Sequence, residues 1–371
     1  MKIHMVDLNG QYQSIKEEIN SAIAKVIESS AFIKGPAVQK FQKNLERFLG
    51  VKHVIPCGNG TDALQLALMA LDLERGDEVI TTPFTFVATV EVISLLGLKP
   101  VFVDIDPDTF NLDAHQIEEK ITDKTKCIIP VHLFGQSCDM TPILDIAEKH
   151  NLKIIEDTAQ AIGANIQIGN ERKMCSTVGD IGTFSFFPSK NLGAFGDGGA
   201  VCTNDDKLAE RIALFANHGS KVKYVYDDIG INSRLDGIQA AILDVKLKYL
   251  ADYQRKRVEA ADRYDALLKE VDAVTVPVRR EDRNHVFHQY TLKIEGIRDE
   301  VKKKLSENGI PTGIYYPSPL HIQKVYNNWN YKEGDFSIAE SMCKCVISLP
   351  MHTELTLDMQ SYIIEILKKA I

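Results

Sequence analysis

The sequence predicts an α/β fold: a large domain with a mixed, mainly parallel seven-stranded sheet, followed by a small C-terminal α+β domain. Two observations predict it. Between residues 53 and 250, short β-rich runs alternate with amphipathic helical stretches, which is the pattern of βαβ units on a parallel sheet. Residues 272–371 mix strand and helix patterns within a shorter stretch. We therefore expect a large domain over residues 1–250 and a small domain over residues 251–371.

Helices are expected between the strands and at both ends of the large domain. Residues 61–72 and 85–96 carry broad apolar faces, and Gly97 ends the second helix. One long charged helix over 236–269 is expected to join the two domains. A helix over 12–30 is expected to pack on the small domain or on a partner. The expected strands cover residues 53–56, 78–81, 100–103, 126–130, 153–156, 182–187 and 199–203.

Composition excludes several functional classes. The net charge of −8 over 371 residues argues against a protein that follows nucleic-acid phosphates. No apolar run approaches the roughly 18 to 20 residues of a membrane span, and the N-terminus lacks the order of a signal peptide, so we expect a cytoplasmic protein. Seven scattered cysteines without a C-x-x-C pair predict reduced, buried thiols and no metal site. Cys343 and Cys345 are expected on one face of a strand.

A short glycine turn follows the first expected strand and opens a helix. Small residues such as Gly58 and Gly60 at a helix N-terminus let backbone N–H groups reach a phosphate, and the helix dipole favours its negative charge. The alternative interpretation is a plain turn in which Asn59 or Thr61 caps the helix.

Two further segments carry chemically active side chains. An apolar strand brings Asp157 to the carboxyl end of the sheet, where open parallel sheets bind ligands and where this carboxylate suits a buried cation. The alternative is a helix cap. Another apolar strand stops at Pro188 and places Lys190 in a turn bordered by glycines. An apolar setting disfavours the ammonium and makes the amine a nucleophile, although most lysines are solvated surface residues.

With these segments in view, the chain resembles the nucleotide-sugar aminotransferases of the DegT/StrS type, a branch of the fold-type I enzymes that use pyridoxal 5′-phosphate (PLP). The resemblance runs almost from end to end. Its motifs occur in the family's order: VDLNGQY, GNGTDAL, TPFTFVATVE, VFVDIDPDTFNLD, PVHLFGQ, IIEDTAQAIGA, FSFFPSKNLGAFGDGGAV, NHG, GINSRLDGIQAAIL and IPTGIYYPSPLH.

The resemblance implies a role for each matching position around the PLP ring. Lys190 would form the Schiff base with PLP and then act as the base that moves the proton. Asp157 would pair with the pyridine nitrogen and keep the ring an electron sink. Gln160 would bond the ring hydroxyl, and Phe86 would stack on the ring face. The phosphate would be held by Gly60, Thr61 and Ser185.

The resemblance also implies a homodimer with shared sites. Asn232 matches the asparagine that reaches the phosphate of the neighbouring subunit in this family; otherwise it stabilises its own loop. Arg234 would contact substrate or anchor that loop. On the sugar side, the residues that match are Tyr315, Tyr316 and His321, although two aromatics and a histidine beside prolines are also typical of a packed edge.

The reaction implied is transfer of an amino group from L-glutamate to a keto group on a nucleotide-linked sugar. We expect C3 of a UDP-linked 2-acetamido-3-keto hexuronic acid or of a dTDP-linked 3-keto-6-deoxyhexose. The alternative is a nucleotide-linked 4-keto-6-deoxy sugar. Relatives that remove a hydroxyl carry His where Lys190 stands, and a non-enzymatic regulator would be expected to lack Lys190 or Asp157. An NAD enzyme is excluded because the first strand lacks G-x-G-x-x-G.

Overall fold

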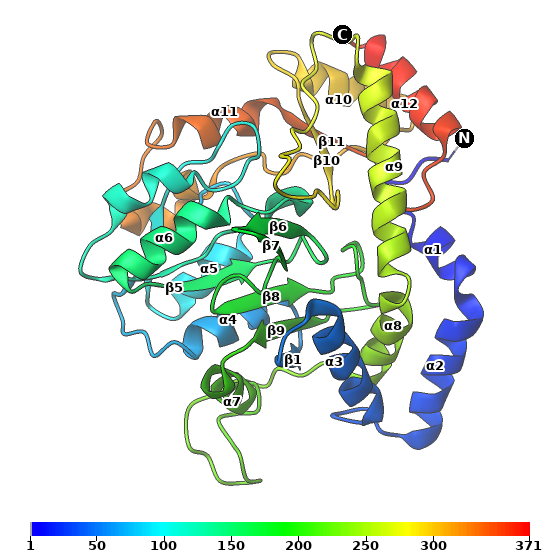
Figure 1. Ribbon diagram of the computed structural model, residues 1–371. Helices are drawn as coiled ribbons and strands as arrows, with labels where there is room; N and C mark the ends of the chain where they lie inside the picture. Colours follow the sequence, from blue (N-terminus) through cyan, green and yellow to red (C-terminus); the bar gives the residue numbers. More distant parts are fainter. Residues whose placement is uncertain (1) are drawn as a thin grey trace.

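The computed structural model describes residues 2–371 and is built around one large sheet (Figure 1), which has seven strands. The strands are β1 His53–Cys57, β2 Glu78–Thr81, β3 Lys99–Phe102, β4 Thr125–Ile128, β5 Lys153–Asp157, β8 Ile181–Ser185 and β9 Gly199–Thr203. Their order is β1-β9-β8-β5-β4-β2-β3. The β1–β9 and β8–β9 pairs are antiparallel and the other four pairs are parallel. The predicted fold class and the seven predicted strands are confirmed, with strand ends displaced by up to two residues.

A separate hairpin escaped prediction. Strands β6 Asn165–Ile168 and β7 Glu171–Met174 pair antiparallel outside the main sheet. The sequence of β7 is ERKM, and its first two residues are exposed. Such a strand has neither an apolar run nor a clear alternation, so the periodicity that identifies the other strands is absent.

Helices cover both faces of the sheet. On one face lie α4 Gly60–Met69, α5 Ala88–Leu95 and α7 Asp206–Phe215, whose apolar side chains pack on Ile155 and Val201. On the other face, α3 Pro36–Leu49 and α8 Gly237–Leu247 pack on Phe184 and Ala200, and α6 Met140–His150 packs on Ile154. Neighbouring strand residues point to opposite faces, and apolar residues on both faces pack against these helices. The sheet is therefore buried on both sides.

The expected long helix is two helices. α8 ends at Leu247 and α9 Leu250–Leu268 follows after a turn at Lys248 and Tyr249, where backbone N–H groups bond carbonyls three residues back. The prediction of one helix over 236–269 is therefore wrong at this turn, which an unbroken charged pattern does not reveal. Figure 1 shows α9 continuing from α8 towards the C-terminal part of the chain.

The N-terminal segment forms α1 Leu8–Ser14 and α2 Lys16–Ser29. Ile15 and Ile19 pack against Ile242 and Val245 of α8. Further upstream, Ile3 lies in the core of the C-terminal unit, which we define as the part of the chain from α9 to residue 371. The chain therefore contacts that unit through its first few residues, while α2 itself packs on α8. The domain division at residue 250 stays a prediction.

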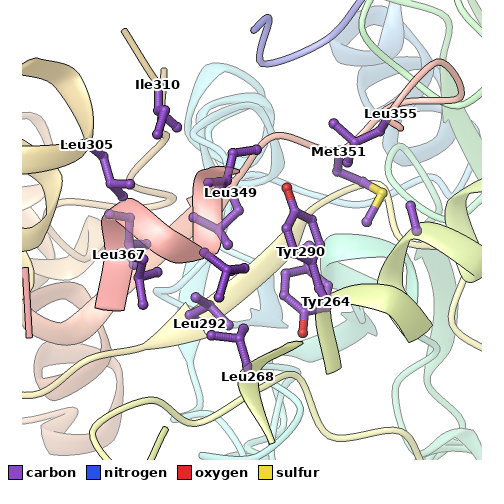
Figure 2. Close-up of a cluster of buried hydrophobic side chains, with 14 of the residues drawn as sticks. Tyr264, Leu268, Tyr290, Leu292, Leu305, Ile310, Leu349, Met351, Leu355 and Leu367 are labelled. Atoms are coloured by element: carbon purple, nitrogen blue, oxygen red, sulfur yellow. The ribbon is translucent and has the colours of Figure 1, made fainter. Parts of the chain in front are cut away.

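The C-terminal unit encloses its own core (Figure 2). Strands β10 Tyr290–Lys293 and β11 Val346–Leu349 pair antiparallel, and α9, α10 Arg298–Glu307 and α12 Leu357–Lys368 surround them. The rings of Tyr264 and Tyr290 stack with centroids 4.8 Å apart. Short 3-10 helices cover Ala114–Gln116, Glu118–Lys120, Leu133–Gly135, Leu320–Ile322 and Lys324–Trp329.

The last helix of this region corrects one expectation. Cys343 and Cys345 lie in α11 Ser337–Cys345, not in a strand; the strand starts one residue later, at Val346. The i, i+2 spacing does not distinguish a strand face from a buried helix end that faces apolar neighbours. All seven cysteines are buried free thiols. Within residues 2–371, no helix combines the length and apolar character needed to cross a membrane.

Candidate active site

A cavity of about 650 Å³ opens at the carboxyl ends of the parallel strands, between the sheet and the C-terminal unit. The first turn of α4, the segment before α5, the ends of β5 and β8 and two segments of the C-terminal unit contribute its walls. It brings together nine of the residues singled out from sequence: Gly60, Thr61, Phe86, Asp157, Gln160, Ser185, Lys190, Tyr315 and Tyr316.

Lys190 lies in the turn after β8, where its backbone N–H donates to the carbonyl of Phe187 at 2.9 Å. Burial disfavours the ammonium and lowers the pKa of Lys190 to about 8, although the nearby Asp157 carboxylate acts in the opposite direction. A lysine with this pKa has a sizeable fraction of neutral amine near neutral pH. It can therefore act as a nucleophile and as a base.

Asp157 is the last residue of β5 and is buried. One carboxylate oxygen accepts a hydrogen bond from the Thr89 hydroxyl at 2.9 Å, and the other accepts from the backbone N–H of Ala159 at 3.1 Å. Residues 158–164 form turns, so the interpretation of Asp157 as a helix cap is wrong. The carboxylate is instead held in a fixed position on the cavity wall.

A buried hydrogen-bond network fixes the end of β5 from behind. Glu156 points away from the cavity and accepts from the backbone N–H groups of Ser176, Val178 and Gly179 at 2.7–2.8 Å. His132 accepts from a backbone N–H at Nδ1, so its Nε2 carries the hydrogen that it donates to Glu156 at 2.9 Å. Because the backbone N–H of His132 also donates to the Asp157 carbonyl at 3.0 Å, the network locks the position of Asp157.

The first turn of α4 forms another wall. Asn59 caps the helix by accepting from the backbone N–H of Asp62 at 2.8 Å. A Cβ atom on Gly60 would lie 2.6 Å from the Cβ of Ser185, so only glycine lets the helix start approach β8 this closely. The cap by Asn59 is compatible with binding of an anion at this helix start. The cap uses one backbone N–H group and leaves the helix dipole directed at the cavity.

Gln160 joins the two units across the cavity. Its side-chain oxygen accepts from the backbone N–H of Phe134 at 2.8 Å, and its side-chain nitrogen donates to the Tyr316 hydroxyl at 3.2 Å. Burial raises the pKa of Tyr316, so its hydroxyl stays protonated. Phe86 is 56% exposed and lines the cavity.

Three predicted residues lie outside this cavity. His321 is fully buried; its Nε2 lies 3.0 Å from Glu340 Oε1 and its ring packs edge-on against Phe336. Asn232 and Arg234 line a second, mostly polar pocket of about 540 Å³. The two pockets adjoin, because they share Asn59, Asp62 and Asp197.

Sequence reasoning missed several groups that face the cavity. Thr89, which donates its hydroxyl to Asp157, lies inside the TFVATVE motif. The threonines of that motif could have indicated a hydrogen-bond donor at the site. His288 and Gln289 come from the C-terminal unit about 100 residues after Lys190, and nothing local marks them. Burial and the charge of Lys190 hold the pKa of His288 well below its ordinary value, so this histidine is neutral.

The donor set fits PLP. A buried carboxylate suits a pyridinium nitrogen, the glycine-lined helix start suits a phosphate, and a lysine with a lowered pKa suits the aldehyde. The fold and this site together define a fold-type I PLP-dependent aminotransferase. The chain belongs to the DegT/DnrJ/EryC1/StrS aminotransferase family, whose sequence profile matches residues 13–368.

Named relatives resemble the whole chain. A pleiotropic regulatory protein of Geobacillus stearothermophilus is 48% identical, covering 98% of this chain and 97% of the relative. The UDP-2-acetamido-2-deoxy-3-oxo-D-glucuronate aminotransferase of Pseudomonas aeruginosa is 42% identical, covering 94% and 95%. The crystal structure of Streptomyces venezuelae DesV in complex with a ketimine intermediate has a TM-score of 0.94 at 36% identity, covering 99% and 98%.

Proposed function

We propose that this aminotransferase moves an amino group from L-glutamate to the C3 keto group of a nucleotide-linked sugar. The acceptor is a UDP-linked 2-acetamido-3-keto hexuronic acid or a dTDP-linked 3-keto-6-deoxyhexose. The observation that carries the proposal is the placement of Lys190 and Asp157 in one cavity with Tyr315 and Tyr316 of the C-terminal unit. The name of the Pseudomonas aeruginosa relative, which acts on a 3-oxo sugar, supports the choice of C3.

The bound cofactor supplies an electron sink for the charge that develops on the substrate carbon. Asp157, whose carboxylate is oriented by Thr89, would keep the proton on the pyridine nitrogen. The first turn of α4 and Ser185 would hold the phosphate, Gln160 would bond the ring hydroxyl, and Phe86 would cover the ring. Lys190 would hold the cofactor, and its Nζ, once free, would move the proton between the substrate carbon and the cofactor carbon that exchanges the amino group.

The sugar enters from the side of the C-terminal unit. Tyr315 and Tyr316 line that side, and the Tyr316 hydroxyl, held by Gln160, is a donor or acceptor for a sugar hydroxyl. His321 has no direct access to the cavity, so we assign it to packing of the C-terminal unit and not to substrate.

Two chains complete each site in this proposal. Asn232 is exposed and lies outside its own cavity, as a residue serving a neighbouring subunit would. Arg234 belongs to the same polar pocket and is assigned to this interface or to substrate. We also place the homodimer in the cytoplasm, because its seven cysteines are free thiols. We assign it to the synthesis of amino sugars for polysaccharide.

The test measures donor and acceptor separately. The purified protein is loaded with PLP, and L-glutamate is added while the visible absorption band of the lysine-bound cofactor is followed. Loss of the band with release of 2-oxoglutarate supports the donor. The amino form is then offered matched 3-keto and 4-keto nucleotide sugars, and the aminated carbon is assigned by NMR. Amination of the 4-keto sugar alone would overturn the C3 proposal, and Lys190→Ala should show neither step.

A further inference from the structure

A second lysine is buried close to the Lys190 loop. Lys246, in α8, is 2% exposed, and its Nζ donates to the Gly193 carbonyl at 2.5 Å and stands 5.6 Å from the centre of the Phe195 ring. Among residues 2–371, no carboxylate forms an ion pair with it. Burying an ammonium with one acceptor costs free energy, which stability alone would avoid with an apolar side chain. Burial and the charge of Arg257 lower the pKa of Lys246 to about 8.

A glutamine two turns earlier on α8 contacts the same loop. The side-chain oxygen of Gln239 accepts from the backbone N–H of Phe195 at 2.8 Å, and its nitrogen donates to the Phe195 carbonyl at 3.4 Å. Gln239 and Lys246 are seven residues apart and so lie on one face of the helix. Together they hold the loop three and five residues after Lys190.

The remaining contacts of the loop leave it little freedom. The backbone N–H of Ala194 donates to the Phe186 carbonyl at 2.8 Å, and the Asn191 side chain donates to the Val286 carbonyl at 3.0 Å. α8 in turn packs on α2 and α3. The Lys190 backbone is therefore tied to the helical layer as well as to the sheet.

Lys190 has two tasks that need the same starting position. It must hold the cofactor and, once released, return its Nζ to the carbon from which the proton leaves. If the loop backbone is fixed, only the side-chain torsions of Lys190 change between the two tasks. Displacement of a reacting group by about 1 Å costs up to about a hundredfold in rate.

We propose that Lys246 and Gln239 are positioning residues that clamp the loop of Lys190 through Gly193 and Phe195, so that Lys190 can alternate between holding the cofactor and moving the proton. This inference rests on the role assigned to Lys190 in the proposed function. It predicts that removing the Lys246 ammonium lowers turnover without weakening substrate binding or stability.

The test compares Lys246→Met with Lys248→Met. The two lysines are neighbours, but Lys248 is exposed and pairs with Glu18 at 2.9 Å. For Lys246→Met we expect kcat to fall by about tenfold or more, with the KM for L-glutamate within about twofold and an unchanged or higher melting temperature. Gln239→Ala should show the same split between kcat and KM. Lys248→Met should match the wild type.

Backbone amide hydrogen exchange of the full chain, with and without PLP, provides a readout independent of activity. Exchange over residues 190–196 should be faster in Lys246→Met and Gln239→Ala than in the wild type and in Lys248→Met. Unchanged hydrogen exchange together with unchanged kcat in Lys246→Met would overturn the clamp. A lower kcat with unchanged hydrogen exchange over residues 190–196 would overturn it as well. If wild-type protein does not react with L-glutamate, the proposed donor fails, while the exchange experiment still tests the clamp.

Discussion

At the scale of single residues, burial affects the pKa of Lys190 more than the neighbouring carboxylate does. Lys190 faces the Asp157 carboxylate, which favours the ammonium, yet the net effect lowers the pKa of Lys190 to about 8 because desolvation is the larger contribution. Asp157 keeps its carboxylate in place through Thr89 and the backbone of Ala159. The pair therefore combines a usable amine with a fixed negative charge.

The rate at which protein freed of PLP captures added PLP should depend on pH through Lys190. Only the neutral amine attacks the aldehyde, and its fraction rises with pH through a pKa of about 8. The capture rate should therefore increase between about pH 6.5 and 8.5 and level off above that range. Stopped-flow absorbance measures it.

Lys190→Ala is the control for this profile. Its cofactor should bind without forming the visible band of the lysine-bound form, at every pH. A wild-type rate that increased only near the ordinary lysine pKa would contradict the effect of burial.

At the scale of elements, the contact between α4 and β8 forms the cavity wall that we assign to the phosphate. The helix start can approach the strand because residue 60 has no side chain; a Cβ there would lie 2.6 Å from that of Ser185. The end of β5 is held by the hydrogen bonds that Glu156 forms with His132 and with the backbone N–H of Ser176. The short-range geometry at the start of α4 and the ends of β5 and β8 thus shapes the proposed cofactor site.

Gly60→Ala should weaken cofactor binding by about tenfold or more, because α4 or β8 must shift to admit the methyl group. The higher helix propensity of alanine offsets part of this strain, so protein freed of PLP should stay folded with a somewhat lower melting temperature. Fluorescence titration with PLP gives the affinity, and thermal unfolding gives the stability. Wild-type affinity in the variant would show that the close approach is not needed for the phosphate.

At the scale of the whole molecule, the cavity depends on how the two units are joined. Asp104, which follows β3, accepts from the backbone N–H groups of Ile338 and Ala339 at the start of α11 at 3.0 and 2.9 Å. Leu320 donates its backbone N–H to the Pro83 carbonyl at 2.8 Å. These bonds bring the tyrosines of residues 315–316 over the sheet, so the site exists only in the assembled fold.

Mixing two inactive variants should restore activity if the sites are shared. In a heterodimer of Lys190→Ala and Asn232→Ala, one site has both changes and the other has neither. Random re-association of equal amounts should then recover about a quarter of wild-type turnover. The assay compares the turnover of the re-associated mixture with that of each variant alone. Size-exclusion chromatography shows whether the mixture contains dimers.

Recovery no greater than the sum of the two variants, in a mixture shown to contain heterodimers, would contradict the cross-subunit role of Asn232. Retained activity of Asn232→Ala alone would contradict it as well. Either result leaves the assignment of Lys190 unaffected.

The sequence by itself determined the fold class, the seven strands of the sheet and the positions of Lys190 and Asp157, because strand periodicity and the turns that follow strands are local properties of the chain. Only the tertiary structure decided which of the candidate side chains face the cavity and which other residues join them. His321 turns into the core to meet Glu340, and His288 enters the cavity from a segment about 100 residues after Lys190. In the sequence, Lys246 is indistinguishable from a surface lysine of a helix, but in the structure it is buried against the Lys190 loop. Such outcomes depend on contacts between residues distant in the chain, and no pattern within one segment encodes them.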